Sequence, residues 1–233
     1  MTYVLGARCI NGVVLVADRK FTISGGTDYL FDVGKLTGEI SGIITAFSGD
    51  RGTFELFRNN IRDYMGDFSI NRPVTVDKIL LKITEIIYDL NKKYYSHNDK
   101  IEIIVGISGK YFPDKKSVLK YFNSDGRPIP INKYQAVGAG ENFGSIYLKR
   151  YFSEKRTMEQ IAELGYFIIK YIEKFELDRS VGIENYEPDI RFIPDNPVDI
   201  NKPDYAPDKE LLKDYNLRIN DRLDKLKNEP FFI

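Results

Sequence analysis

Short apolar runs rich in β-branched residues open the chain, and turn residues separate them. Residues 3–10 and 13–17 are such runs, and Asn11-Gly12 lies between them. An Asn-Gly pair between two apolar runs is the strongest short-range signal for a β-hairpin, because both residues of its two-residue turn take positive φ. The chain is therefore predicted to begin with a hairpin, and the glycine-containing residues 23–33 are predicted to follow as a loop.

Segments of the same character recur along the chain and predict further strands. Each is a short run of apolar or β-branched residues bounded by turn-forming residues. The predicted strands cover residues 35–37, 43–47, 101–107, 117–122, 128–131, 134–137, 181–186 and 190–193. The last two are expected to pair as a second hairpin.

Other segments repeat apolar residues at three- and four-residue steps, which places those residues on one face of a helix. Asp50 is predicted to cap a helix over residues 51–64, because a carboxylate accepts N–H groups left free in the first turn. Thr157 and Gln160 form a capping-box pattern, which predicts where a later helix begins. The remaining helices are predicted over residues 76–94, over a segment that ends near residue 151, and over residues 208–226.

The order of these elements favours a layered α+β fold. Strands come in blocks and helices come in blocks, which is typical of antiparallel sheets covered by helices. Residues 1–193 are predicted to form one domain, and the proline-rich residues 194–207 are predicted to be an extended linker. The amphipathic helix at the end of residues 194–233 is expected to pack on the same domain or on a neighbouring chain.

The charge balance and the apolar run lengths narrow the classes of function. Lysines plus arginines equal aspartates plus glutamates at 34 each, and this zero net charge argues against a nucleic-acid binder, which needs a basic surface. No run approaches the roughly 18 apolar residues that predict a membrane span, and no charged-then-apolar signal segment is found. We therefore expect neither a nucleic-acid partner nor a membrane partner.

Cysteine and histidine each occur once. Cys9 alone cannot form an internal disulfide, and its use favours a reducing compartment, so a cytoplasmic location is expected. His97 as the single histidine argues against a Ser-His-Asp triad, and no His/Cys cluster has zinc-ligand spacing. We expect no metal and no cofactor, which leaves Thr, Lys, Asp and Ser to supply any chemistry.

Thr2 is the first candidate for that chemistry. It becomes the N-terminal residue once Met1 is removed, and removal is predicted because Thr is small enough for a methionine aminopeptidase to act. An N-terminal threonine carries its own base, since its α-amino group lies beside its hydroxyl. The return strand of the predicted hairpin ends at Asp18, which places an acid at the same edge of the sheet.

Several runs together carry a resemblance to a known family. They are Thr2-Tyr3-Val4-Leu5-Gly6, Gly12-Val13-Val14-Leu15-Val16-Ala17-Asp18-Arg19, Lys35-Leu36 and Phe47-Ser48-Gly49. With the element order, these runs resemble the β-type subunits of the proteasome and their relatives among the N-terminal nucleophile (Ntn) hydrolases. The resemblance implies a four-layer αββα sandwich of two antiparallel sheets over residues 1–193, and it does not extend into the C-terminal tail.

The resemblance implies a role for each matching residue. Thr2 would be the nucleophile, and its freed amine would be the base. Lys35 falls where the family keeps a lysine close to the threonine hydroxyl, and Asp18 falls where an acid holds that lysine charged and oriented. Gly49 falls where a backbone N–H at a helix N-terminus binds the oxyanion.

The resemblance also implies where a substrate side chain would lie. Phe21, Phe47 and Arg51 fall at positions that shape the family's primary specificity pocket. Two aromatic rings and an arginine there imply a small or partly closed pocket.

Two positions depart from the family pattern near the threonine amine. The family often has a serine between two glycines of a strand-to-helix turn, and Ala139 stands there. The family also has an aspartate three residues before a serine; Ser180 keeps the serine, but Leu177 occupies the aspartate position and Asp178 is one residue off. Ser180 is therefore a candidate amine support, and Asp178 serves only if the loop shifts.

The function implied is an N-terminal threonine peptidase that hydrolyses peptide bonds of a peptide or protein through an acyl-enzyme on Thr2. A transpeptidase that passes the same acyl group to an amine is the nearest alternative. An inactive assembly or scaffold subunit is the alternative from another class, and Ala139 and Leu177 favour it. The family also implies a homo-oligomer or ring, with other proteasome-like subunits as further partners.

Overall fold

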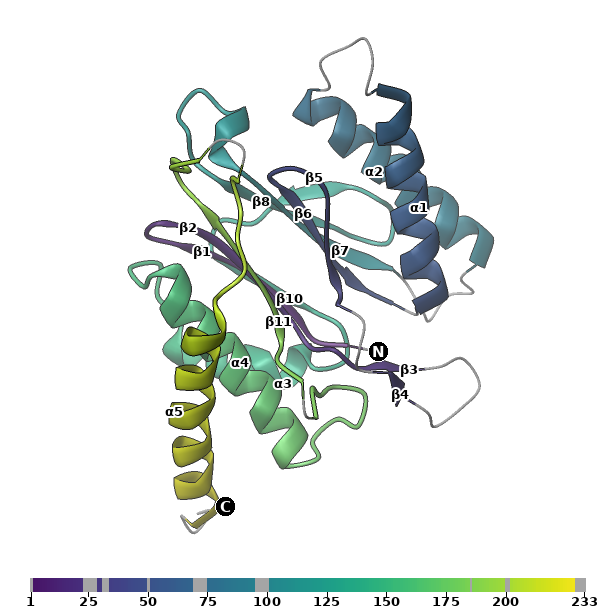
Figure 1. Cartoon of the computed structure of the whole chain (residues 1–233). Coiled ribbons are helices and arrows are strands. Elements are labelled where there is room, and N and C mark those ends of the chain that lie inside the picture. Colours follow the sequence, from purple (N-terminus) through teal and green to yellow (C-terminus); the bar gives the residue numbers. More distant parts are fainter. Residues whose placement is uncertain are drawn as a thin grey trace.

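Two antiparallel sheets face each other and carry helices on their outer sides, which gives a four-layer αββα arrangement (Figure 1). The layered α+β architecture expected from the sequence is confirmed. The computed structural model describes residues 2–22, 29–30, 34–49, 51–68, 75–94, 101–184, 186–199 and 202–228. Asp50, with its predicted helix cap, and His97 lie outside the described residues.

The first sheet has the strand order β10-β1-β2-β11, and all of its neighbouring strands are antiparallel. Its strands are β1 (Val4–Cys9), β2 (Gly12–Ala17), β10 (Tyr134–Val137) and β11 (Asp189–Pro194). Val4 pairs with Ala17 in the β1–β2 hairpin. The residues just before β1 therefore lie beside the residues just after β2.

The second sheet has the strand order β5-β6-β7-β8-β9. Its strands are β5 (Leu36–Ile40), β6 (Ile43–Ser48), β7 (Glu102–Ile107), β8 (Val118–Phe122) and β9 (Pro128–Pro130). A short two-stranded sheet pairs β3 (Phe21–Thr22) with β4 (Tyr29–Leu30), so the predicted loop over residues 23–33 contains a strand.

Helices cover the outer face of each sheet (Figure 1). The second sheet carries α1 (Arg51–Phe68) and α2 (Val76–Tyr94), and the first carries α3 (Glu141–Tyr151) and α4 (Met158–Lys174). Thr157 and Gln160 form the predicted capping box at the start of α4. Helix α5 (Lys209–Asn228) lies along α4, and a 3-10 turn spans Gly109–Tyr111. No helix of the described residues is long and apolar enough to cross a bilayer.

Apolar clusters fill the spaces between the four layers. The cluster between the sheets comes from alternate residues of both, because successive strand residues point to opposite faces. It includes Val4, Leu15, Ile44, Ile104 and Ile193. Since fully buried aliphatic side chains each contribute roughly 1.5–3 kcal/mol of hydrophobic free energy, this layer fixes the two sheets against each other.

The C-terminal helix packs on its own chain. Tyr215, Ile219 and Leu223 lie one helical face apart, are almost fully buried, and join the apolar cluster of the first sheet and α4. The Tyr215 hydroxyl also donates to the carbonyl oxygen of Glu159 on α4 at 2.8 Å.

The N-terminal hairpin turns one residue earlier than predicted. Cys9 pairs with Gly12, so the turn is Ile10-Asn11, and Asn11 is not among the residues with positive φ. Tertiary contacts account for the shift. The Asn11 Oδ1 accepts the N–H of Met158 at 2.9 Å, and its carbonyl oxygen accepts the N–H of Asp195 at 3.0 Å. These bonds hold the turn against α4 and the end of β11.

The predicted strand over residues 181–186 does not form in the described part of that segment, and β11 pairs with β2 instead. The backbone N–H groups of this segment are used elsewhere. Those of Ile183 and Glu184 donate to Glu173 Oε1 at 2.8 and 2.7 Å, and that of Gly182 donates to Asp18 at 3.3 Å. Carboxylates therefore take the donors that a strand ladder would need.

Candidate active site

Thr2 lies two residues before the start of β1 and is fully buried. The loop between β10 and α3 holds its backbone, since the N–H of Gly140 donates to the Thr2 carbonyl oxygen at 3.3 Å. Gly138 in the same loop has a φ of +92°, and a Cβ there would overlap that carbonyl oxygen. Only glycine meets both conditions, so Gly138 allows the close approach of this loop to Thr2.

Asp18 lies directly after β2 and faces the start of β1. Its N–H donates to the carbonyl oxygen of Tyr3 at 3.1 Å, and the N–H of Tyr3 donates to its Oδ1 at 3.0 Å. Its Oδ2 accepts the N–H groups of Lys20 and Gly182, each at 3.3 Å. Backbone donors from three segments therefore orient a carboxylate that has no exposed surface.

Lys35 comes from the other sheet and brings the cation. It directly precedes β5, and its carbonyl oxygen accepts the N–H of Phe47 on β6 at 3.2 Å. Its Nζ donates to Asp18 Oδ1 at 2.5 Å, to the Thr2 hydroxyl oxygen, and to the carbonyl oxygen of Lys20 at 2.6 Å. The Thr2 hydroxyl in turn donates to Asp18 Oδ1. The hydroxyl is therefore placed between a cation and a carboxylate.

The environment shifts the pKa of Lys35. Burial lowers the pKa of its ammonium from the usual value, while the Asp18 carboxylate acts in the opposite direction. The ion pair is almost completely inaccessible, with side-chain exposures of 1% for Lys35 and 0% for Asp18. A buried ion pair that is broken leaves an uncompensated charge, so each partner depends on the other.

Asp189, at the start of β11, supports this cluster and was not predicted from the sequence. Its Oδ2 accepts the N–H of Leu36 at 2.9 Å, and it also takes a backbone hydrogen bond from Lys35. Burial raises the pKa of Asp189, and these two hydrogen bonds oppose the rise. Asp189 acts through backbone amides and belongs to no motif, so only the fold brings it to the lysine.

Three other predicted site residues, Phe47, Gly49 and Arg51, lie at or just after the end of β6. Gly49 follows that strand and precedes α1, as expected for a strand-to-helix turn. The Phe47 ring is fully buried and packs against the rings of Phe54 and Phe57, with centroids 5.2 and 6.0 Å apart. Arg51 is exposed at the start of α1. Phe21 lies in β3, and its side chain is outside the described residues.

Ser180 and Asp178, the predicted supports of the Thr2 amine, form hydrogen bonds with each other. The hydroxyl and the N–H of Ser180 both donate to Asp178 Oδ1, and no hydrogen bond from either residue to Thr2 is found in the described part of the chain. Leu177 is at the surface, with 36% of its area exposed. Ala139 lies between Gly138 and Gly140 and is therefore beside Thr2, without a hydroxyl to offer.

The fold and this cluster define a class of protein before any comparison is made. Two antiparallel sheets between helices, with a threonine at the open end of the first hairpin bonded to a lysine from the facing sheet, describe an Ntn-hydrolase-like fold. A family model described as "Proteasome subunit" matches residues 2–185. The chain belongs to the proteasome subunit family, as the resemblance in its sequence indicated.

A solved structure agrees with the family match in fold. Anbu from Hyphomicrobium sp. strain MC1 has a TM-score of 0.71 to this chain at 15% sequence identity, and the match covers 99% of this chain and 100% of that one. The coverage includes the C-terminal helix, which the family match leaves out. A search of curated proteins found no match.

Proposed function

We propose that this chain is an N-terminal threonine peptidase that hydrolyses peptide bonds through an acyl-enzyme on Thr2. The observation that carries the proposal is the contact of the Thr2 hydroxyl with both the Lys35 ammonium and the Asp18 carboxylate. All three side chains are buried, so their interactions are stronger than they would be in water. Membership of the proteasome subunit family supports the same reading.

The mechanism begins with attack of the Thr2 hydroxyl oxygen on the substrate carbonyl carbon. Its proton passes to the free α-amine, and the charge that develops on the carbonyl oxygen is bound by the Gly49 N–H. When the C–N bond breaks, the protonated amine gives its proton to the leaving nitrogen. Water then attacks the ester carbon while the amine accepts a proton from it, and the amine returns this proton to the Thr2 oxygen as the ester C–O bond breaks. The acid product is released and Thr2 is again a free hydroxyl and a free amine. Lys35 keeps the hydroxyl polarised, and Asp18 keeps Lys35 charged.

The mechanism requires that Met1 be removed, because a peptide-bonded nitrogen on Thr2 is not a base. We expect the intact mass of the protein from its native cell to correspond to a chain that begins at Thr2. Retention of Met1 on all of the protein would make this active site impossible.

Hydrolysis of a fluorogenic peptide panel tests the proposal. The mature wild type is expected to release the reporter, Thr2→Ser is expected to keep part of the rate, and Thr2→Ala is expected to have none. Circular dichroism and thermal unfolding of the three proteins control for folding. A wild type with no activity on any peptide, or a Thr2→Ala variant as active as the wild type, contradicts the proposal. Addition of an amine nucleophile shows whether the acyl group passes to water or to a new peptide bond.

An inactive assembly subunit is the second candidate. It is favoured by Ser180 and Asp178, which bond to each other, and by Ala139, which offers no hydroxyl beside Thr2. Members of the proteasome family typically oligomerise, and we propose that this chain forms a homo-oligomeric ring in the cytoplasm. Native mass spectrometry would give the stoichiometry. A ring without peptidase activity would support the assembly role, and an active protein of any stoichiometry would refute it.

A further inference from the structure

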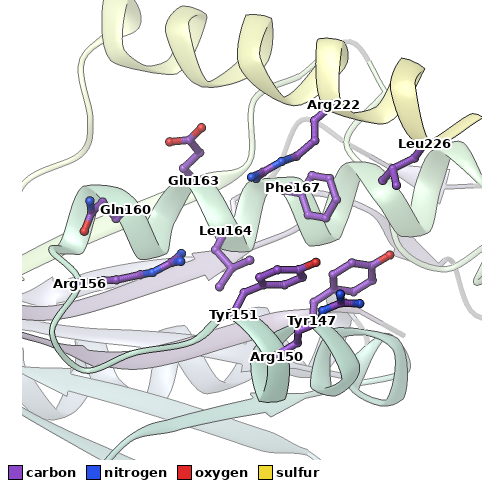
Figure 2. Close-up of a pocket in the computed structure, with 10 residues that line it drawn as sticks. All are labelled: Tyr147, Arg150, Tyr151, Arg156, Gln160, Glu163, Leu164, Phe167, Arg222 and Leu226. Atoms are coloured by element: carbon purple, nitrogen blue, oxygen red, sulfur yellow. The ribbon is translucent and has the colours of Figure 1, made fainter. Parts of the chain in front are cut away.

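A cavity of about 470 Å³ lies between α3, α4 and α5, and it contains none of the candidate catalytic residues (Figure 2). Its volume is within the roughly 300–1,000 Å³ that small-molecule sites usually have. Helix α5, which lies beyond the family match, contributes two of the lining residues, Arg222 and Leu226.

Three arginines line this cavity from three different segments. Arg150 comes from the end of α3, Arg156 from the α3–α4 connection and Arg222 from α5. Within the described residues, none of the three makes an ion pair with a carboxylate. Each guanidinium carries a positive charge, so the three arginines place three positive charges at the cavity.

The one acid of the lining does not cancel this charge. Both oxygens of Glu163 are occupied by Arg218, which lies outside the lining, at 2.9 and 3.1 Å. This two-point contact of a carboxylate with a guanidinium is the strongest common geometry for such a pair. The three lining arginines therefore face the cavity without a local counter-charge from Glu163.

Three aromatic rings also line the cavity. The ring centroids of Tyr147 and Tyr151 are 6.2 Å apart at 19°, and Tyr147 meets Phe167 edge-on at 5.4 Å. Arg150 lies 5.3 Å from the Tyr151 centroid, and Arg222 lies 5.7 Å from that of Phe167. Figure 2 shows Arg222 projecting from α5 toward Phe167. Tyr151 keeps 39% of its surface exposed, which leaves a ring on which another planar group can stack.

We infer that this cavity binds a small molecule that joins a planar aromatic ring to a phosphate, the chemistry of a nucleoside mono- or diphosphate. A phosphate carries between one and two negative charges and several acceptor oxygens, which match guanidinium donors in pairs. The base stacks on Tyr151 and the neighbouring guanidinium planes. The site is separate from the residues proposed for catalysis, so it would make the protein responsive to a second ligand.

Isothermal titration of the full chain with AMP and ADP tests this site, with adenosine and inorganic phosphate as partial probes. At least one nucleotide is expected to bind, and each partial probe is expected to bind at least tenfold more weakly, because it satisfies only half of the cavity. Arg150→Gln and Arg222→Gln are each expected to weaken nucleotide binding by roughly 10- to 100-fold, as expected for loss of a charge-assisted hydrogen bond. Tyr151→Phe is expected to bind as the wild type does, and Tyr151→Ala more weakly.

Lys225→Gln is the matched control, because Lys225 is on α5, pairs with Asp221 and does not line the cavity. It should bind nucleotide as the wild type does, and so should Thr2→Ala, whether or not the chain is a peptidase. Absence of binding by either nucleotide, or equal binding by the Arg222→Gln variant, would overturn the inference. A change of stoichiometry in Arg222→Gln without nucleotide binding would instead identify the arginines as contacts between chains, which also overturns it.

Discussion

At each end of the β1–β2 hairpin, a carboxylate, a cation and a hydroxyl link the two sheets. At the open end these are Asp18, Lys35 and Thr2. At the turn end, Arg8 donates to Asp195 at 2.8 Å and to the carbonyl oxygen of Ser117, which directly precedes β8 in the second sheet. Similar groups therefore link the two sheets at both ends of the hairpin.

The difference lies in what the hydroxyl contacts. The Ser117 hydroxyl donates to the carbonyl oxygen of Pro194 at 2.7 Å and accepts the N–H of Gly109, so both of these hydrogen bonds are with the backbone. Among the described residues, the hydrogen bonds found for the Thr2 hydroxyl are with two ionisable side chains, those of Asp18 and Lys35. The Arg8 pair is also partly open to water, with side-chain exposures of 23% and 15%. Under the proposed function, this difference separates a reactive hydroxyl beside a preorganised charge from a structural hydroxyl held by the backbone.

Removal of the two cations gives the largest expected contrast. Lys35→Met keeps the length and apolar stem of the side chain and should lower kcat/KM by about 10²–10⁴-fold, the range for loss of a positioned acid, base or charge stabiliser. Arg8→Met should change it by no more than about threefold. Peptide hydrolysis by both variants measures the contrast. Equal losses in the two variants would show that Lys35 is only a structural link.

The same pair of variants should differ in stability. Lys35→Met leaves Asp18 as a buried charge without its partner and should lower the free energy of unfolding by about 3–5 kcal/mol. Arg8→Met removes a partly exposed pair and should cost about 1–2 kcal/mol. Urea denaturation measures both values. The double variant Lys35→Met/Asp18→Asn removes the stranded charge and should recover part of the stability without activity, which separates folding from chemistry.

The buried lysine should also give the pH profile an early alkaline limit. kcat/KM should rise with pH as the Thr2 amine loses its proton and can act as the base. At higher pH, kcat/KM should fall again, because a neutral Lys35 side chain no longer stabilises the developing charge. Since burial lowers the pKa of Lys35, this fall should begin before pH ~10.4, the ordinary lysine pKa.

Stability should move in the opposite direction over that alkaline window. Between the lowered pKa of folded Lys35 and the higher pKa of the unfolded chain, the unfolded state binds more protons, so the contribution of Lys35 to stability rises with pH. The free energy of unfolding of the wild type minus that of Lys35→Met isolates this contribution. A difference that does not change with pH would mean that burial does not perturb Lys35.

The smallest expected effect is a rise in kcat/KM when a hydroxyl is added near the Thr2 amine. Ala139→Ser places a hydroxyl in the loop that already bonds the Thr2 backbone, and it should raise kcat/KM by about fivefold, the value of one ordinary hydrogen bond. Ser145→Ala, which changes a partly exposed serine on nearby α3, is a neutral control for this region. A loss of activity in Ala139→Ser would show that the amine is held by other groups.

Local pattern predicted the elements best where one apolar face decides them. The bounds of α2 and β10 follow from residue spacing alone. The predictions for the hairpin turn and for the segment after Ser180 were wrong, because Asn11, Gly182 and Ile183 form hydrogen bonds with distant parts of the chain. Local propensity contains no information about such partners.

Among the residues of the candidate site, too, some could be predicted from the sequence and others could not. Thr2, Asp18 and Lys35 were found through spacing that resembles a family, and the structure brings them together. Asp189 was missed because it acts on backbone amides, which any residue provides. The arginines of the α3–α4–α5 cavity were missed because Arg150 and Arg222 become neighbours only when α5 packs on α4.

The claim that Thr2 is a nucleophile can be tested directly by mapping a covalent adduct. The mature protein is treated with an epoxyketone probe, which reacts with both the hydroxyl and the amine of an N-terminal threonine, and the modified peptide is sequenced by mass spectrometry. One adduct on the peptide that begins at Thr2, absent from Thr2→Ala and strongly reduced in Lys35→Met, is the predicted result. An unmodified N-terminal peptide from correctly folded protein that lacks Met1 would contradict the account.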